Sequence, residues 1–573
     1  MTKRFQLFIN HPKKPVAFIC IITSLLYIKT LAFGLTSMDE QWMIVNNVPF
    51  LSHWSSLIQA FTEATTDSYY RPLFMVSLIL DYHLGKLSPL IYHLINLCWH
   101  LAAIYLLFWL FSLLEINRTK SFIFILLFAI HPALVQAVAW IPGRNDLMLC
   151  VFILLSLINL IKFIKTKKST YLILHFIFFV CSLLTKESAI LLALIYVVLY
   201  FIYNSKPSKL MFPLIIWTLI GYIWYLVRME VVKIPIQINL DLNVIKDMLL
   251  AYLLFFGKVL LPFQQSIMPT VTDNSLWFGL LTLVFILFLV FKIELENKKL
   301  AFLGLWLFVV LLLIPIWFGV TKAGSEHYEQ RIYSSLAGIL LFFTQLKFNL
   351  NSKMFSYLII IVCLFYLAKT YHRLSVYKND LTYINTGIDE CPNYYLFYLQ
   401  KADLLAKQSN YSEAIPLYNK AISLRPNYAQ ALSNRGMTYL NTGAYNKAIV
   451  DFSEAIKAGG FNKLFYVNRC LALYKNRDFE NAMKDLIILK KCCLASIPPD
   501  LEKELMKHWI DQMDGLMKQL YKERNNAELF YKISKMYFDI EMESEAEKYI
   551  HQALMLDPNN ETYVEFKKRM DSK

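Results

Sequence analysis

Two adjacent carboxylates, Asp39 and Glu40, follow the first long apolar segment and are the residues best placed to carry chemistry. That segment, residues 16–35, holds a single charge, Lys29. A carboxylate inside a membrane costs roughly 2.5–3.5 kcal/mol on insertion scales, so the pair ends the helix or acts at the membrane surface. One carboxylate could serve as a general base while the other tunes it. The alternative is a stop signal followed by a solvated loop.

The composition is that of a polytopic membrane protein with a polar tail. Of the 573 residues, 57% are hydrophobic, the mean hydropathy is +0.44 and the formal net charge is +15. The basic residues lie between apolar runs, as in cytoplasmic loops, so the charge does not indicate nucleic-acid binding. No small-residue cleavage site precedes Asp39, which predicts an uncleaved first span. The nine cysteines lack the spacing of metal ligands.

Charge and hydropathy together predict eleven membrane crossings. A crossing needs about 20 apolar residues, and residues 72–84 are shorter and contain Asp81 and His83. Counting that segment, or residues 247–262, as a crossing would put basic loops outside, so both are predicted to be interfacial or re-entrant helices. An odd number places the tail on the same face as Asp39. The predicted crossings are residues 16–36, 90–114, 121–141, 146–163, 170–185, 188–204, 209–228, 275–291, 300–320, 332–347 and 353–371.

In this topology, the polar residues outside the basic loops gather on the face that carries Asp39. Charges held near helix ends of an apolar protein line a water-filled cavity or bind a charged ligand. The alternative is mutual ion pairing that fastens the helix ends. The set comprises Asp39, Glu40, Tyr70, Arg71, Pro72, Arg144, Asp146, Lys186, Glu187, Glu326, His327, Glu329 and Arg331.

The tail shows a repeat of 34 residues, most visible in Ala414, Ala448 and Ala482. Small residues at this period, aromatic residues in the next layer and a proline after each helix pair are typical of tetratricopeptide repeats. Repeats are predicted at residues 395–428, 429–462, 463–496 and 527–560, with an irregular helical pair in residues 495–526. The predicted fold is therefore all-α, with a membrane helix bundle in residues 1–371 and a soluble tetratricopeptide-repeat solenoid in residues 372–573.

Several motifs together resemble one family. In order and spacing, and joined to the repeat tail, they are similar to polytopic glycosyltransferases of the GT-C superfamily. The closest likeness is to the TMTC-type branch, which combines transmembrane helices with tetratricopeptide repeats and is related to protein O-mannosyltransferases. The motifs are DEQWMIVNN at 39–47, YRPL at 70–73, YHLINLCWH at 92–100, HPALVQAVAWIPGRNDLM at 131–148, TKESA at 185–189 and RIYSSLAG at 331–338.

The resemblance implies transfer of a sugar from a polyprenyl-phosphate carrier on the outer face of the membrane. It implies that Asp39, with Glu40 beside it, deprotonates an acceptor hydroxyl. The leaving phosphate needs cations, preferably arginine. The candidates are Arg144 and Arg331, with Lys186 and Arg71 behind them, and the other predicted cavity residues are Asp146, Glu187, His131, Glu329 and Tyr333.

Two departures from the family pattern lie near Arg331. Ser335 stands where the family has proline two residues after the tyrosine, and Gln330 stands where an acidic residue is expected directly before Arg331. The sequence leaves a divalent metal open. Asp39 and Asp146 could form half of such a site, but no further ligand spacing completes it.

The sequence thus predicts an integral-membrane glycosyltransferase, with mannose as a candidate sugar and a protein serine or threonine as the candidate acceptor. The repeats would capture a protein or peptide acceptor. The alternatives are a non-catalytic membrane-anchored scaffold and a transporter, although the membrane half shows no internal repeats. We expect a bacterial inner membrane with the repeats periplasmic, or alternatively the endoplasmic reticulum with the repeats lumenal.

Overall fold

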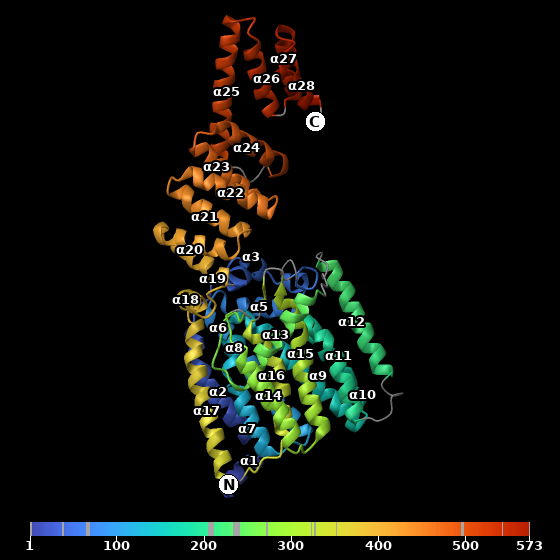
Figure 1. Cartoon of the computed structure of the whole chain (residues 1–573). Helices are drawn as coiled ribbons and strands as arrows, with labels where there is room; N and C mark the ends of the chain where they lie inside the picture. The colour runs from blue at the N-terminus through green and yellow to red at the C-terminus, as the bar shows by residue number, and fades with distance from the viewer. Residues whose placement is uncertain are drawn as a thin grey trace. The chain divides into compact units, whose positions relative to one another are not determined.

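The chain folds into helices that form two units (Figure 1). This computed structural model describes residues 3–36, 39–64, 69–203, 211–232, 241–270, 273–321, 324–325, 328–350, 352–493, 498–540 and 542–571. The first unit is Met1–Asn393 and the second is Tyr394–Lys573. The division falls later than residue 371 because the segment after the last apolar helix packs on the first unit. Gly34 N donates to Lys378 O at 3.1 Å, and Ile267 N donates to Glu390 at 3.0 Å.

The first unit is a bundle of apolar helices joined by short connections. Two two-residue strands, Val320–Thr321 (β1) and Gly324–Ser325 (β2), pair antiparallel beside it. The helices are α1 (Lys3–Asn10), α2 (Lys14–Tyr27), α3 (Val48–Leu51), α4 (Ser56–Gln59), α5 (Pro72–Gly85), α6 (Pro89–Leu113), α7 (Arg118–Ala129), α8 (Val135–Ala139), α9 (Arg144–Thr166), α10 (Ser169–Leu183), α11 (Leu192–Tyr203), α12 (Met211–Val231), α13 (Leu242–Leu260), α14 (Trp277–Lys292), α15 (Lys298–Gly319), α16 (Tyr333–Thr344), α17 (Lys353–Leu374) and α18 (Asp380–Glu390).

The structure does not confirm eleven crossings. Among the described residues, five helical segments are long and apolar enough to cross a membrane: Lys14–Ala32, Pro89–Leu113, Ile141–Thr166, Met211–Val231 and Lys353–Tyr377. Other predicted crossings form helices that are too short, such as α16 with 12 residues, which rises only about 18 Å.

The predicted crossing at 121–141 is a broken one. Its two parts, Arg118–Ala129 and Pro132–Ala139, meet at an angle of 50°. Pro132 interrupts the helix because it lacks an N–H. After the break, α9 starts directly against α8: a Cβ on Gly143 would lie 2.8 Å from Ala137 Cα. Only glycine permits this approach, which brings the start of α9 to the Asp39 end of the bundle.

The second unit is built from antiparallel helical hairpins. The alanines that define the 34-residue period, Ala414, Ala448 and Ala482, are fully buried, as their small size in helix contacts predicts. The hairpin helices are α19 (Tyr395–Lys407) with α20 (Tyr411–Leu424), α21 (Ala429–Asn441) with α22 (Tyr445–Gly459), α23 (Lys463–Lys475) with α24 (Phe479–Cys493), and α26 (Ala527–Asp539) with α27 (Glu543–Leu556), followed by α28 (Glu561–Asp571).

The prediction of an irregular helical pair before the last repeat is wrong. One helix of 24 residues, α25 (Pro499–Lys522), fills most of that interval. Proline at its start and acidic residues in its first turn favour a helix there, and no proline or helix-breaking pair interrupts the following residues.

Candidate active site

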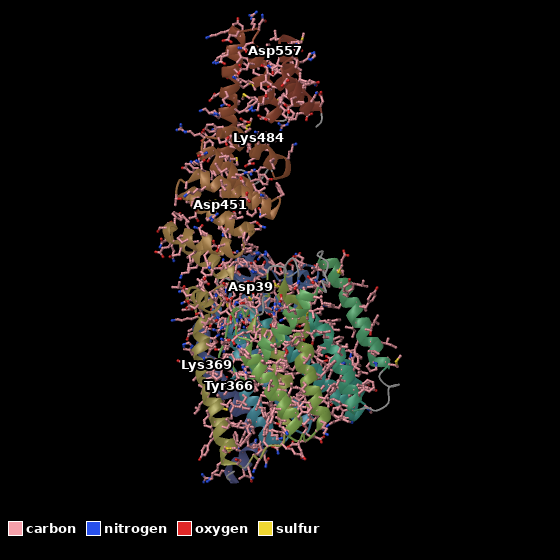
Figure 2. All side chains as sticks on the ribbon, in the orientation of Figure 1. Asp39, Tyr366, Lys369, Asp451, Lys484 and Asp557 are labelled. Carbon is pink, nitrogen blue, oxygen red and sulfur yellow. The ribbon has the colours of Figure 1, made fainter. Side chains whose placement is uncertain are left out.

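Asp39 lies at the end of the bundle opposite to the N-terminus (Figure 2). Its side chain is half-buried at the start of a short helical segment that continues as Gln41–Val45. Burial raises the pKa of Asp39, while a hydrogen bond with Trp42 and the positive charge of Arg71 partly offset that effect. A carboxylate with a raised pKa is a better proton acceptor than one in water.

Arg71 reaches this region from the start of α5, where Pro72 occupies the first turn. Its Nε and Nη2 donate to Glu187 Oε2 at 3.0 and 2.9 Å, and its guanidinium lies 4.0 Å from the ring centroid of Tyr69. Burial lowers the pKa of Arg71, but Glu187 and Tyr69 outweigh that effect and the net shift is upward. Arg71 therefore remains a cation.

Lys186 and Asp146 form a second ion pair beside the first. Lys186 Nζ lies 2.6 Å from Asp146 Oδ1, in the first turn of α9, where the helix dipole favours a carboxylate. Burial lowers the pKa of Lys186, and Asp146 counteracts it while Arg71 and Arg331 add to it. Three cations thus repel one another across a small region.

Arg331 completes the cluster from the segment Glu329–Ile332. Its guanidinium lies 5.6 Å from the centroid of Tyr328, and that ring stacks on Trp140 at 5.6 Å. Burial lowers the pKa of Arg331, opposed by Tyr69, Tyr328 and Asp146. Arg331 is thus a cation over the ring of Tyr328, within electrostatic reach of the Lys186–Asp146 pair.

The structure therefore brings together six of the predicted site residues, which come from five separate segments of the chain. They carry three positive and three negative charges when all are ionised, so the cluster is close to neutral. Such a cluster can bind an anion when one carboxylate becomes protonated. The six residues are Asp39, Arg71, Asp146, Lys186, Glu187 and Arg331.

Glu40 has different surroundings from the neighbouring Asp39. Only 1% of it is exposed, and its carboxylate accepts the backbone N–H groups of Thr36 and Ile141, the latter at 3.0 Å. Burial raises the pKa of Glu40 to about 7. These contacts join the first loop to the start of the 3-10 turn before α9.

Arg144, a predicted phosphate ligand, is buried inside the bundle. It is 0% exposed. Its guanidinium contacts Asp81 at 2.5 Å, Asn96 Oδ1 at 2.7 Å and the carbonyl of Tyr92 at 2.8 Å. These contacts hold the guanidinium inside the bundle.

Glu329 lies apart from the cluster. It is 1% exposed, pairs with Lys258 and accepts Ser266 N at 2.8 Å. It lies 4.0 Å from Arg373, and it therefore joins α13 to α17. In the sequence, Glu329 stands one residue further from Arg331 than the acidic residue of the family pattern. In the structure, its partners are Lys258, Ser266 and Arg373.

His131 and Tyr333 are buried packing residues as well. His131 Nε2 lies 3.0 Å from the carbonyl of Val259, and its Nδ1 accepts Ala133 N at 3.2 Å. Tyr333 OH lies 2.6 Å from His100 Nδ1. Among the described residues, neither makes a hydrogen bond to the six-residue cluster. Glu326 and His327 lie outside the described residues.

Among the described residues, Asp39 and Asp146 do not belong to a group that could hold a metal ion. Within the part of the chain that the structure describes, no group of three or more histidine, cysteine, aspartate or glutamate side chains could hold an ion. Asp146 instead holds Lys186.

Sequence reasoning missed the partners of Arg144 and Glu329. Asp81 inside an apolar segment was a signal for the first of them, because a charge there needs a buried counter-ion, and that counter-ion is Arg144. Lys258 and Arg373, the partners of Glu329, gave the same kind of signal. Tyr69 and Tyr328, under the two arginines, carry no motif that marks them.

The second unit matches tetratricopeptide families. The TPR repeat model matches residues 402–443, and the Tetratricopeptide repeat model matches residues 429–458 and 527–560. The predicted repeats are thereby confirmed over these residues, and the unit is a tetratricopeptide-repeat domain.

The chain is also similar to curated protein O-mannosyl-transferases of the TMTC type, which confirms the resemblance seen in the motifs. It is 24% identical over 424 residues to a protein O-mannosyl-transferase of Caenorhabditis elegans, across 68% of this chain and 60% of that relative. It is 31% identical over 172 residues to Tmtc1 of Drosophila melanogaster, across 29% of this chain and 20% of the relative. Human TMTC2 is 38% identical over 115 residues, or 20% of this chain and 13% of the relative.

The chain spans at most 60% of the length of these three relatives. Among solved structures, the crystal structure of YrrB, described as a TPR protein with an unusual peptide-binding site, aligns with 32% of this chain and 97% of its own. With a TM-score of 0.21 and 19% identity, that overlap supports no inference.

Proposed function

We propose that this chain is an integral-membrane glycosyltransferase that moves a sugar from a polyprenyl-phosphate carrier to a serine or threonine hydroxyl of a protein. The observation that supports it is the six-residue cluster at one end of the bundle, in which Asp39, a carboxylate of raised pKa, lies within electrostatic reach of Arg71, and Arg71 in turn lies within reach of Lys186 and Arg331. Mannose is the first candidate sugar, because relatives of this chain are named protein O-mannosyl-transferases.

Asp39 acts as the general base. A serine or threonine hydroxyl is a weak nucleophile, and a carboxylate within hydrogen-bond reach removes its proton as the oxygen attacks the anomeric carbon. The bond between that carbon and the phosphate oxygen breaks, and the polyprenyl phosphate leaves with the electron pair. The hydrogen bond with Trp42 orients the carboxylate.

Arg331 and Arg71 hold the phosphate, with Lys186 adding positive charge. A guanidinium matches two phosphate oxygens at once, which makes arginine the stronger ligand. Arg71 is fixed by Glu187, and Arg331 is placed over Tyr328, so each guanidinium has a set orientation before the donor arrives. Preorganised charges of this kind stabilise a transition state without a reorganisation cost.

The charges balance through the step. The donor carries a phosphodiester with one negative charge, and the leaving phosphate monoester carries about −1.5 to −2 at pH 7. The cluster becomes one charge more positive when Asp39 takes the proton. Proton transfer therefore generates the positive charge that the departing phosphate requires.

The repeat domain would capture or present the protein acceptor, since tetratricopeptide repeats bind proteins and peptides on extended surfaces. This requires the repeats and Asp39 to share a face of the membrane, which an odd total number of crossings would provide. That face is non-cytoplasmic by the charge of the loops. Subcellular fractionation of the host shows whether the chain resides in a bacterial inner membrane or in the endoplasmic reticulum.

The function is tested with purified chain, radiolabelled mannosyl-phosphoryl-polyprenol and a serine- and threonine-rich acceptor peptide. Label in the peptide, released by β-elimination, is the expected result. If the chain binds the donor but moves none of several lipid-phosphate sugars to peptide, protein or free hydroxyl acceptors, the transferase is refuted. A chain that binds no such lipid would instead be the membrane-anchored scaffold that the sequence also allowed.

A further inference from the structure

Lys29 is a charge inside a membrane-spanning segment, and the proposed transfer does not use it. It follows α2 within Lys14–Ala32, one of the five segments that are long and apolar enough to cross a membrane. A charge in such a segment is costly, and it is kept where a partner of opposite charge or a polar group compensates it. The partners of Lys29 therefore decide what it does.

The ammonium group of Lys29 is held by α17, which lies in a second segment of this kind. Its Nζ donates to the carbonyl of Tyr371 and to Ser375 Oγ at 3.3 Å, and it lies 3.8 Å from the centroid of the Tyr371 ring. All of these partners are neutral. Among the described residues, Lys29 forms no ion pair with a carboxylate. An ammonium has three N–H donors, so one N–H and the whole charge are left for another molecule.

Tyr371 lies at a depth where lipid head groups are expected. From Lys353 to Tyr371 the axis of α17 rises about 27 Å, close to the roughly 30 Å thickness of a hydrocarbon core. Tyr371 is 61% exposed, and tyrosine is enriched where the hydrocarbon meets the head groups. The cation of Lys29 thus lies near a membrane surface, toward the end of the bundle that carries Asp39.

Two exposed apolar stripes lead to this cation. In each stripe the residues recur at intervals of three and four, which keeps them on one face of a helix. The first span and α17 pack on each other and run side by side in Figure 1. The contact between Lys29 and Tyr371 joins the ends of the stripes. They comprise Phe18, Ile21, Leu25 and Ile28 on the first span, and Met354, Tyr357, Ile361, Leu364 and Tyr371 on α17.

We propose that Lys29, Tyr371 and Ser375 bind the head group of a membrane phospholipid with a net negative charge. One phosphate oxygen accepts the remaining N–H of Lys29 in a charge-assisted hydrogen bond. The hydroxyl of Ser375, which accepts from Lys29, can donate its own proton to a second phosphate oxygen. The acyl chains lie along the two stripes.

Charge and shape decide which lipid fits. A zwitterionic head group brings its own cation, which competes with Lys29 for the phosphate, so a net negative head group is favoured. Two stripes suit a lipid with two acyl chains, whereas a polyprenyl phosphate has a single chain. The site holds whether or not the chain transfers a sugar, because it uses none of the six residues of the cluster.

The test is native mass spectrometry of the full-length protein, released from detergent micelles that contain equal amounts of phosphatidylglycerol and phosphatidylcholine with the same acyl chains. The wild type should retain phosphatidylglycerol about tenfold more than phosphatidylcholine, as expected for a hydrogen bond to a charged group. Lys29→Met keeps the length of the side chain without its charge and should remove this preference. Lys29→Arg keeps the charge and should preserve it.

Two further variants separate the site from general charge effects. Tyr371→Leu removes the ring that holds the ammonium and should weaken the preference severalfold. Lys475→Met is the matched control, since it removes an exposed lysine that lies 5.9 Å from the ring of Tyr474 in the repeat domain. It should leave the ratio of the two lipids as in the wild type. Thermal melts of each variant confirm folding.

Equal retention of the two lipids by the wild type overturns the proposal, and so does a preference that survives in Lys29→Met. If Lys29→Met does not fold, Tyr371→Leu decides, and an unchanged preference in that variant overturns the proposal as well. In a last arm, undecaprenyl phosphate competes with phosphatidylglycerol. If it displaces phosphatidylglycerol from the wild type and its own binding is lost in Lys29→Met, the occupant is the carrier lipid and the assignment to a phospholipid is wrong.

Discussion

At the scale of single residues, neighbouring carboxylates do different work because their surroundings differ. Asp39 is half-buried next to Trp42 and Arg71, whereas Glu40 is almost wholly enclosed by backbone N–H groups. Enclosure raises the pKa of Glu40 to about 7. The pair was visible in the sequence, but which of the two carboxylates is enclosed depends on the backbone that each side chain meets in the fold.

Glu40 predicts a pH dependence of stability. The unfolded chain loses the Glu40 proton near pH 4.5 and the folded chain near 7, so the folded state holds a proton that the unfolded state has lost between these values. The stabilisation is complete below pH 4.5 and is lost as the pH rises through 7. The melting temperature of the wild type should therefore fall between pH 5 and 7 more steeply than that of Glu40→Gln.

The control for this experiment is Glu63→Gln, an exposed glutamate in the same loop region. Its melting curve should follow the wild type at every pH. Equal slopes for the wild type and Glu40→Gln would show that Glu40 does not titrate in this range.

Arg331 predicts a kinetic effect. Removing a preorganised charge from the leaving phosphate costs about 100-fold in rate, so Arg331→Ala should lower kcat/KM for the lipid donor by about that factor. Arg331→Lys keeps the charge without the bidentate geometry and should lose less. Arg118→Ala, at the other end of the bundle, should behave like the wild type. Unchanged donor kinetics in Arg331→Ala would remove this residue from the phosphate site.

At the scale of elements, the buried contact between Asp81 and Arg144 joins α5 to α9. Asp81→Asn leaves the arginine charge buried without its partner, which costs about 3–5 kcal/mol. The variant should therefore melt at a much lower temperature and yield less folded protein. Normal stability combined with lost transfer would instead support a role for Arg144 in the site.

The sequence predicted some elements and missed others for physical reasons. Periodicity located the hairpins because Ala414, Ala448 and Ala482 must be small where helices touch. Hydropathy could not separate a crossing from a broken helix, since both look equally apolar until Pro132 is placed in space. Motifs grouped Arg71, Lys186 and Arg331 correctly, but they could not show that Arg144 is already surrounded by its own partners.

At the scale of the whole molecule, the proposed delivery of acceptors by the repeats depends on how the chain crosses the membrane. Eleven crossings put the tail on the same face as Asp39 and place Lys167 on the opposite face. Epitope tags inserted after Lys167 and after Asn410 should then react with antibody on opposite sides of sealed vesicles. Both tags on one side would contradict the odd number of crossings predicted between Lys167 and Asn410, and with it the delivery of acceptors by the repeats.

The most direct test of the central claim is transfer activity in the Asp39→Asn variant. With labelled lipid-phosphate sugar and acceptor peptide, Asp39→Asn should show no transfer above background while it melts like the wild type and still binds the donor. Asp39→Glu should keep some activity because a carboxylate remains. The same transfer rate in Asp39→Asn as in the wild type would contradict the account, because no base would then be needed at this position.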